Sequence, residues 1–243
     1  LHRDGERIRH FMGTSTFAEA TVMPEVALAK VDPEAPLDVV CTLACGATTG
    51  LGAALYIAKV EPGSTCVVFG AGLVGLGAVA GCRLAGAERI IAVDLAEERL
   101  EAARAQGATE TLMGGPDVVD QIVESTGGFG ADYTFEATGI VAVMRQAVES
   151  ARMGWGLCTV AGVAGKGEVL EVVPRFLITG RRIAGASFGG ARGRDNVPEL
   201  VNLYMQGKLD LESLVTSRLE LGAVNDAFAA MERHEGIRSV ITY

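Results

Sequence analysis

The sequence has few basic residues relative to acidic ones, and it has few aromatic residues. Lys and Arg number 21 against 30 Asp and Glu, so the formal net charge is −9. Nucleic-acid binding depends on clustered Lys and Arg, and this charge therefore predicts no nucleic-acid partner. Aromatic residues make up 5% of the chain, and Ala, Val and Leu dominate its 49% of hydrophobic residues. Such small apolar residues suit an α/β protein, in which helices pack closely on a parallel sheet.

The sequence also shows no signal peptide and no Cys-x-x-Cys pair. Its cysteines are odd in number and irregularly spaced, which indicates a reduced protein in the cytoplasm. No charge occurs from residue 62 to residue 82, but six glycines in this stretch favour a strand, a turn and a helix over a membrane span. We therefore predict a cytoplasmic protein without a membrane partner. The cysteines are Cys41, Cys45, Cys66, Cys82 and Cys158.

From about Thr65 onward, short β-branched runs alternate with helical stretches. This spacing predicts right-handed β–α–β units and a doubly wound parallel sheet, so the fold class is α/β. Gly107 directly follows one charged helix and suits its C-terminal cap. The predicted strands cover residues 66–69, 89–93, 109–113, 133–136, 157–163 and 182–187. The predicted helices cover residues 73–85, 97–106, 117–126 and 140–153.

The two ends of the chain differ from this central part. Residues 1–46 are rich in loops, with two short β-like pieces, FAEATVM and VALAKV. Residues 190–243 carry two predicted helices, at 197–206 and 223–235, and a final strand, SVITY. Neither end is expected to fold alone. We interpret them as two flanks of a second domain, which meet in space around the inserted residues 47–189.

A glycine-rich turn follows the first predicted strand and opens the first helix. Its sequence, Gly70-Ala-Gly72-Leu-Val-Gly75, fits the G-x-G-x-x-G pattern, although a chain with 32 glycines meets this pattern easily by chance. The first glycine allows a tight turn, the second lets a pyrophosphate approach the backbone, and the third lets the helix pack on the strand. The N-terminus of the helix then offers free N–H groups to the phosphates.

An acidic residue stands where such a site needs one. Asp94 ends the second predicted strand, where a carboxylate accepts hydrogen bonds from ribose hydroxyls and repels a 2′-phosphate. The sequence therefore predicts NAD rather than NADP, and Arg99 is the nearest cation that could reach the ribose or the adenine. The alternatives are a purely structural glycine turn with Asp94 as a helix N-cap, and the nucleotide site of a methyltransferase.

Several segments of the sequence are similar to those of zinc-dependent medium-chain alcohol dehydrogenases. They include GTSTF at 13–17, CTLACGATTG at 41–50, FEATG at 135–139 and GIRSVITY at 236–243. The resemblance covers the chain from its first residues to its last, and it is closest to the classical and glutathione-dependent formaldehyde dehydrogenase classes. It implies a Rossmann NAD-binding domain at 47–189. Residues 1–46 and 190–243 would then be remnants of a GroES-like, β-rich catalytic domain.

The resemblance implies roles for individual residues. Cys45 matches the last ligand of the catalytic zinc, whereas Cys41 and the three later cysteines are expected to be buried thiols. Thr49 would act at the catalytic centre and, with Val74, pack against the nicotinamide ring. Phe11 and Met12 would line an apolar substrate pocket. The other implied cofactor contacts are Leu73, Thr138, the pyrophosphate-binding Arg238, and the backbone near Ala161, Val163 and Phe188.

The sequence departs from this family in what it does not contain. A second cysteine and a histidine as zinc ligands, a four-cysteine structural-zinc lobe and a proton relay are implied by the resemblance and not found. We expect the N-terminal part of the catalytic domain to be missing. In one hypothesis, the chain belongs to a complete zinc dehydrogenase that transfers a hydride between NAD and an alcohol, or the thiol-hemiacetal of formaldehyde. The alternatives are a truncated NAD-binding or dimerisation module without catalysis, and a zinc-free reductase of the same superfamily.

The resemblance also implies an oligomer. The family dimerises through the edge strand of its cofactor domain, and RIAGAS at 182–187 matches that place. An open apolar edge risks uncontrolled association unless it is paired, so we predict a homodimer or homotetramer. The substrate is expected to be a small-molecule alcohol or aldehyde.

Overall fold

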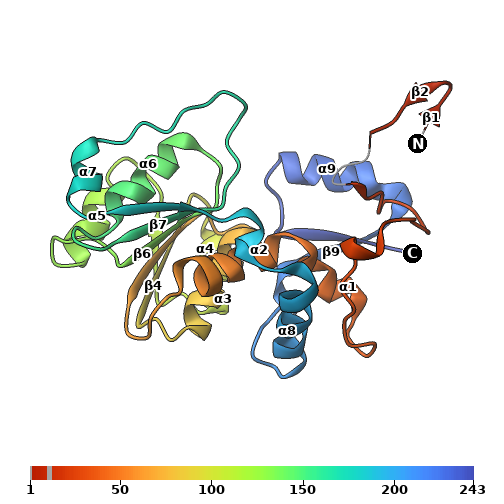
Figure 1. Ribbon diagram of the computed structural model, residues 1–243, viewed down its shortest axis with the longest axis horizontal. Helices are drawn as coiled ribbons and strands as arrows, with labels where there is room; N and C mark the ends of the chain where they lie inside the picture. The colour runs from red at the N-terminus through yellow and green to blue at the C-terminus, as the bar shows by residue number, and fades with distance from the viewer. Residues whose placement is uncertain (1, 10–12) are drawn as a thin grey trace.

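The structure, a computed structural model, describes residues 2–9 and 13–243. Its centre is a six-stranded sheet in which every neighbouring pair of strands is parallel. The strands are β3 (Thr65–Phe69), β4 (Arg89–Asp94), β5 (Glu110–Met113), β6 (Tyr133–Glu136), β7 (Leu157–Val160) and β8 (Arg182–Gly185). Their order, β5-β4-β3-β6-β7-β8, reverses direction between β3 and β6 (Figure 1). This is a Rossmann-type sheet, and the predicted α/β doubly wound fold is confirmed.

The helices between these strands also agree with the sequence pattern. They are α3 (Leu73–Leu84), α4 (Glu97–Gln106), α5 (Val118–Ser125) and α6 (Val141–Ser150). The sequence pattern did not predict the short helix α7 (Pro174–Ile178), which precedes β8. Helix α4 ends as expected at Gly107, whose φ of 114° lies in the left-handed region and whose N–H bonds back to Ala103 and Arg104. Helix α6 ends three residues before the predicted position, because Ala151 is extended and pairs with Ala131.

Alternate residues of β3, β4 and β7 belong to two separate cores, one on either face of the sheet. On β3, Cys66 and Val68 belong to the core that α3 covers, together with residues of α4. Val67 and Phe69 belong to the other core, which α5 and α6 cover. Because strands in a parallel sheet are buried on both faces, β3 consists almost entirely of apolar residues. This packing holds the carboxyl ends of β3, β4 and β6 in a fixed arrangement.

The two flanks of the chain lie side by side, away from the sheet (Figure 1). The first flank contains α1 (Leu37–Val40). The second flank, after β8, forms α8 (Gly193–Met205), β9 (Val215–Glu220), α9 (Val224–Glu232) and β10 (Arg238–Thr242). The Asp38 carboxylate on α1 accepts a 2.7 Å bond from Arg218 Nε on β9. Phe17 meets Phe228 of α9 edge to face at 5.9 Å, and Tyr243 donates to the carbonyl of Thr16 at 2.8 Å. The flanks are thus in direct contact, although about 200 residues separate them in sequence.

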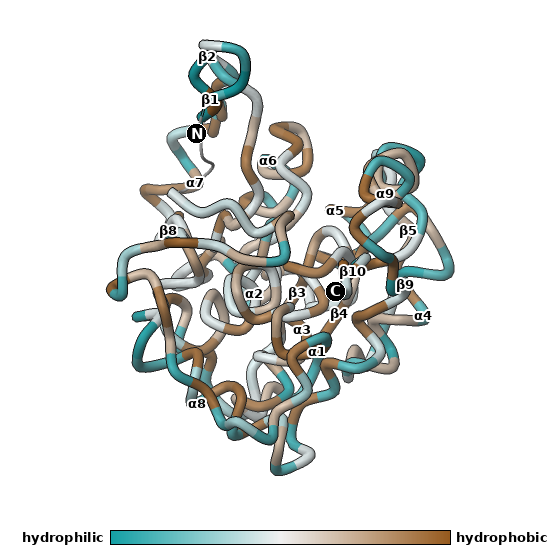
Figure 2. The backbone as a smooth tube through the Cα atoms, turned by 90° about the vertical axis from the view of Figure 1, so that its right-hand side faces the viewer, coloured by the Kyte–Doolittle hydropathy of each residue, from teal (hydrophilic) through white to brown (hydrophobic). Residues whose placement is uncertain are grey.

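The sequence pattern was wrong about the local structure of the first flank. The two predicted β-like pieces at 17–23 and 26–31 form no strand, and only a 3₁₀ turn, Glu25–Ala27, occurs there. Val22 and Val26 are 98% and 72% exposed, because no neighbouring strand lies against these β-branched residues. Strand propensity depends on such a partner. A hairpin of this flank, β1 (His2–Arg3) with β2 (Glu6–Arg7), is hydrophilic and projects from the body of the molecule (Figure 2).

In the first flank, the sequence pattern also missed β1, β2 and α1. It missed two further elements as well. One is β9, whose sequence VTSRLE carries two charges and pairs in parallel with β10. The other is α2 (Gly46–Gly52), which continues as a π-helical stretch through Ala53–Ala58 and is largely buried. Among the described residues, no single helix is long and apolar enough to cross a membrane. Only the pair 37–44 and 46–58, bent by 57°, reaches that length and apolarity when taken together.

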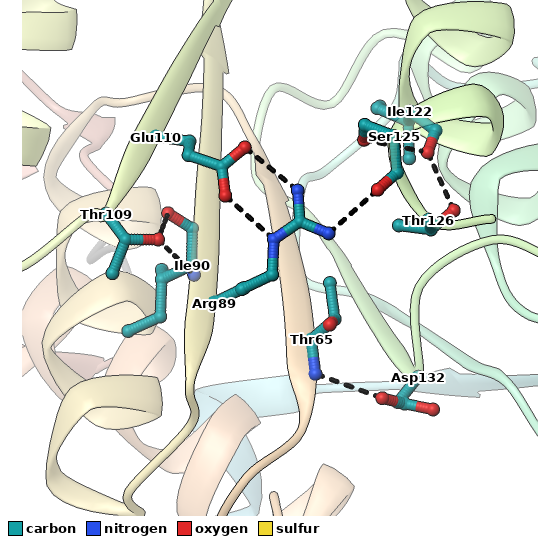
Figure 3. A network of polar contacts seen from close by, with 9 residues as sticks. All are labelled: Thr65, Arg89, Ile90, Thr109, Glu110, Ile122, Ser125, Thr126 and Asp132. Atoms are coloured by element: carbon teal, nitrogen blue, oxygen red, sulfur yellow. Dashed lines mark hydrogen bonds and ion pairs between the residues drawn. The ribbon is translucent and has the colours of Figure 1, made fainter.

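A polar network joins strands at the amino end of the sheet (Figure 3). The guanidinium of Arg89 donates two bonds to the Glu110 carboxylate, at 2.8 and 2.9 Å, and a third to the carbonyl of Ser125. Nearby, Asp132 accepts the backbone N–H of Thr65 at 3.0 Å. These bonds connect the starts of β3, β4 and β5 with the end of α5 and the residue before β6. They therefore restrain the end of the sheet opposite to its carboxyl edge.

Replacing Glu110 with glutamine should lower the free energy of unfolding at pH 7 by about 0.5 kcal/mol, because the pair is partly exposed. The hydrogen bond from Arg89 lowers the pKa of Glu110, and the same bond raises the pKa of Arg89. A carboxylate with a lowered pKa in the folded state stabilises the fold above its unfolded pKa and loses that contribution as the pH falls through its folded pKa.

The difference between wild type and Glu110→Gln should therefore be constant from pH 7 to about pH 5.5 and should vanish by about pH 3. Urea unfolding at each pH measures it. A difference that grows toward acid pH would contradict the assignment.

Candidate functional site

The glycine turn lies between β3 and α3, at the point where the strand order reverses. Gly70 has a φ of 88°, which favours glycine, and its N–H bonds to the carbonyl of Val93 at 2.8 Å. A Cβ on Gly75 would collide with the Gly70 carbonyl, so the helix packs tightly on the turn. At Gly72, the residue before α3, a Cβ would meet only Arg99 Nη1, at 3.3 Å. The turn therefore leaves its backbone open to a ligand at the N-terminus of α3.

Asp94 ends β4 beside this turn. Its Oδ2 atom accepts the N–H of Ala71 at 2.7 Å, and its Oδ1 atom accepts the N–H groups of Leu95 and Ala96. The carboxylate is not an N-cap of α4, because Ala96 holds that position without a side-chain bond. A carboxylate has about four acceptor sites, so Oδ2 retains one for a further donor. Asp94 thus links the glycine turn to β4 and keeps acceptor capacity.

A cavity of about 670 Å³ lies along the carboxyl ends of β3, β4 and β6. Arg99, on α4, donates from Nη2 to the carbonyls of His234 and Gly236, at 3.1 and 3.4 Å, and so connects this cavity to the second flank. The structure brings five of the predicted cofactor residues together in its wall. They are Gly70, Gly72, Asp94, Arg99 and Thr138.

The open backbone at Gly72, the acceptor on Asp94 and the apolar walls fit the phosphates, ribose and adenine of a dinucleotide.

A smaller cavity, of about 330 Å³, surrounds Cys45. Cys45 immediately precedes α2 and is exposed, and its carbonyl accepts both the N–H and the hydroxyl of Thr49, at 2.9 and 2.8 Å. Leu73 and Arg238 line the same cavity, so three predicted residues from three elements meet there. Phe17 of GTSTF lies in its wall as well, which places the GTSTF segment beside Cys45.

The remaining predicted residues lie along the same carboxyl edge or outside the described residues. A Cβ on Gly50 would collide with the carbonyl of Val74, which puts Val74 against α2. Ala161 follows β7 and donates its N–H to the Glu136 carbonyl at 2.8 Å, and Val163 is 91% exposed. Phe188 has a φ of 48° and lines a third cavity, of about 660 Å³. Phe11 and Met12 fall outside the residues that the structure describes.

The chain is similar to known proteins in both sequence and structure. Residues 74–206, more than half of the chain, match a protein family described as zinc-binding dehydrogenase. The chain belongs to the zinc-binding dehydrogenase family. Its predicted relation to medium-chain alcohol dehydrogenases is thereby confirmed.

Individual relatives of this zinc-binding dehydrogenase agree with the family assignment. The chain is 47% identical over 242 residues to alcohol dehydrogenase class-3 of Myxine glutinosa, covering 98% of itself and 64% of that protein. It is 45% identical over 244 residues to an S-(hydroxymethyl)glutathione dehydrogenase of Escherichia coli, covering 99% of itself and 66% of that protein. A crystal structure of an alcohol dehydrogenase zinc-binding domain protein from Burkholderia ambifaria superposes with a TM-score of 0.90 at 36% identity, over 95% of this chain and 62% of that one. The chain thus spans 62–66% of the length of these relatives.

The described residues of this chain do not complete a zinc site. A catalytic zinc takes three protein ligands from Cys, His or carboxylate side chains. Within residues 2–9 and 13–243, no group of three or more His, Cys, Asp or Glu side chains could hold a metal ion. A zinc ion at Cys45 would therefore need ligands from outside these residues.

The prediction for Cys41 was wrong, whereas those for the three later cysteines were right. Cys66, Cys82 and Cys158 are fully buried, but Cys41 is exposed. Cys41 begins a 3₁₀ turn after α1 and lines the cavities around Cys45 and Phe188. Its sulfur is still partly desolvated, and this burial, together with the nearby Asp38 carboxylate, raises the pKa of the thiol.

Sequence reasoning missed several residues of the 670 Å³ cavity beside the glycine turn. His234 lines it from the second flank, with a φ of 60° just after α9, and no motif in the sequence indicated this place. Gly114 and Gly115 follow β5, and Gln146 lies on α6. The two glycines could have been found, because ligands of such sheets bind at the carboxyl ends of strands. His234 could not, because its position depends on how the flank packs against the sheet.

Proposed function

We propose that this chain binds NAD in the 670 Å³ cavity and supplies the cofactor half of a zinc-dependent dehydrogenase. The observation that carries the proposal is Asp94, a carboxylate at the end of β4 that holds the glycine turn and borders the cavity. An acidic residue in this place selects NAD, because it accepts bonds from both ribose hydroxyls and repels a 2′-phosphate.

Each part of the cofactor would contact a different set of residues in the site. Gly70, Gly72 and Gly75, with the first N–H groups of α3, would bind the pyrophosphate, and Arg238 would neutralise part of its charge. Asp94 and Arg99 would bind the adenosine ribose. The nicotinamide half would extend toward Cys45, between Thr49 and Val74, with Leu73 and Thr138 beside the cofactor. The backbone of Ala161, Val163 and Phe188 would bond its carboxamide.

The reaction in the whole protein would be hydride transfer between NAD and an alcohol, or the thiol-hemiacetal of formaldehyde. The names of the relatives, alcohol dehydrogenase class-3 and S-(hydroxymethyl)glutathione dehydrogenase, support this substrate class. Cys45 would be one zinc ligand, and a bound zinc ion would polarise the substrate oxygen. In this proposal, residues 47–189 form the NAD-binding domain, and 1–46 with 190–243 belong to the catalytic domain. Phe11 and Met12, within the first of these segments, would line the substrate pocket. The protein would act in the cytoplasm.

Isothermal titration calorimetry of the 243-residue chain with NAD and with NADP tests the cofactor assignment. NAD should bind at one site, at least about tenfold more tightly than NADP, because only NADP brings a phosphate to the Asp94 carboxylate. Binding of neither dinucleotide would overturn the proposal.

A second candidate function is a dinucleotide-binding or dimerisation module without catalysis. It is favoured by the absence of a possible metal-binding group among the described residues. Zinc analysis of the purified protein separates the two. A stoichiometric zinc ion that a Cys45→Ser variant loses supports the dehydrogenase, and zinc-free protein that still binds NAD supports the module.

We further propose a homodimer, or a homotetramer built from dimers, through β8. This strand pairs with β7 on one side only, and Ile183 on it is 37% exposed. Sedimentation at micromolar concentration should give at least a dimer, because an apolar edge gains from pairing with a second copy. An Ile183→Lys variant should shift the protein toward monomer. Glu98→Lys, an exposed position on α4 beside the opposite edge of the sheet, should leave its mass unchanged. A monomeric wild type would contradict this interface.

A further inference from the structure

Glu136 is a buried carboxylate to which the proposed cofactor contacts give no role. It is the last residue of β6, and its exposed fraction is 0%. It forms no ion pair with any described Lys, Arg or His. Its Oε2 atom is buried and has no hydrogen-bond partner among the described residues. An acceptor that loses water without gaining a partner costs free energy, and such a group calls for a functional explanation.

The other oxygen, Oε1, holds the turn that follows β6. The backbone N–H groups of Thr138 and Gly139 donate to it at 2.6 and 2.9 Å, and the Thr138 hydroxyl donates as well. Hydrogen bonds from several donors stabilise negative charge on an oxygen. The charge also acts on its surroundings. Burial raises the pKa of the Cys158 thiol to about 12. A hydrogen bond with Thr134 opposes this rise, and the Glu136 carboxylate adds to it with an effect smaller than that of Thr134.

The unpartnered oxygen lies against the loop that follows β7. A Cβ on Gly162 would lie 2.5 Å from Oε2 and would collide with the N–H of Gly139. The backbone carbonyl of Glu136 also accepts the N–H groups of Ala161 and Gly162, at 2.8 and 3.0 Å. The buried charge therefore sits directly beside 161–163, the segment to which the proposed function assigns the nicotinamide carboxamide.

The same turn touches the phosphate-binding glycines. A Cβ on Gly70 would lie 2.7 Å from the Thr138 methyl carbon, and Ala137 donates its N–H to the carbonyl of Phe69 at 2.9 Å. Glu136 is thus anchored to the ends of β3, β6 and β7, and its position cannot shift freely. A fixed charge in a region of low dielectric acts more strongly on a nearby ion than the same charge in water.

We propose that the Glu136 carboxylate is a counter-charge for the oxidised nicotinamide ring and makes the site prefer NAD⁺ over an uncharged dinucleotide. The oxidised ring carries one positive charge, and the reduced ring carries none. This inference rests on the proposed function, because it requires the ring to lie beside 161–163. It adds a residue that acts through its charge rather than by direct contact.

Calorimetry with two ligands and the Glu136→Gln variant tests the counter-charge. The ligands are NAD⁺ and its analogue with benzamide in place of nicotinamide, which has the same planar ring and carboxamide without the charge. The 243-residue wild type should bind NAD⁺ about tenfold more tightly than the analogue. Glu136→Gln keeps an oxygen for the three donors of the turn, and it should bind the two ligands equally.

Two further variants separate charge from structure. Thr138→Val disturbs the same turn but keeps the carboxylate. It should therefore lower the affinity for both ligands by the same factor and preserve the ratio of the two affinities. Glu124→Gln removes an exposed carboxylate on α5 and should change neither affinity.

The inference is overturned if the wild type binds NAD⁺ and the analogue equally, a result that needs no variant to fold. It is also overturned if Glu136→Gln keeps the wild-type ratio of the affinities for NAD⁺ and for the analogue. A wild type that binds neither ligand would overturn the proposed function itself, and this inference with it.

Discussion

Replacing Gly50 with alanine is expected to lower the free energy of unfolding by about 3 kcal/mol, the largest stability effect we predict for a single methyl group. Helices α2 and α3 cross in close contact at this glycine. A Cβ there would collide with the Val74 carbonyl and lie 2.6 Å from the Ala78 nitrogen. Both contacts are to backbone, so a change of side-chain conformation cannot relieve them. The helices would have to move apart, and the buried residues between them would lose their packing.

Urea unfolding monitored by circular dichroism measures this loss. Gly222→Ala is the matched control, because a Cβ at Gly222 would meet no atom within 4 Å. The control should remain within about 0.5 kcal/mol of wild type. Equal stabilities for the two variants would show that α2 and α3 separate without cost, contrary to the packing described.

Replacing Asp94 with asparagine is expected to weaken NAD binding about 50-fold, because each hydrogen bond to a charged acceptor contributes about 1.5–3 kcal/mol. The same change removes the negative charge that repels a 2′-phosphate, so NADP should lose little affinity or gain some. The preference for NAD over NADP should therefore fall by about 50-fold. Calorimetry with both dinucleotides gives this ratio directly.

The control for this experiment must allow for the structural role of Asp94, whose Oδ2 atom also accepts the N–H of Ala71. The melting temperature of each variant shows whether the glycine turn survives. Asp120→Asn, an exposed acid on α5, should change neither affinity. If Asp94→Asn loses NAD and NADP affinity by the same factor, Asp94 supports the turn and does not discriminate between the cofactors.

The sequence predicted the central sheet and its helices well because their signals are local. Apolar runs, a glycine after a helix and an acid at a strand end each lie within a few residues of the structure that they indicate. The glycine turn and Asp94 were found in this way, and the structure places both at the same cavity.

The sequence failed where structure depends on distant partners. Residues 17–31 contain β-branched residues, but without a neighbouring strand they remain loops with exposed side chains. Cys41 was expected to be buried and is exposed, because the chain turns after α1. Glu136 stands within FEATG, and the sequence did not reveal that one of its oxygens is buried without a partner. Such features follow from tertiary packing, which no local pattern contains.

The contact between the two flanks has a consequence for how the chain acquires its structure. Residues 13–45 are synthesised before the sheet, yet their partners Arg218, Phe228 and Tyr243 are synthesised after it. Domains generally form as units during synthesis, and contacts of high sequence separation form late. We therefore expect β3 to β8 to assemble before the first flank gains its partners. The contacts of Asp38, Phe17 and Thr16 with the second flank can form only after β9, α9 and β10 have been synthesised. The sheet would then fold first, and the two flanks would be completed together.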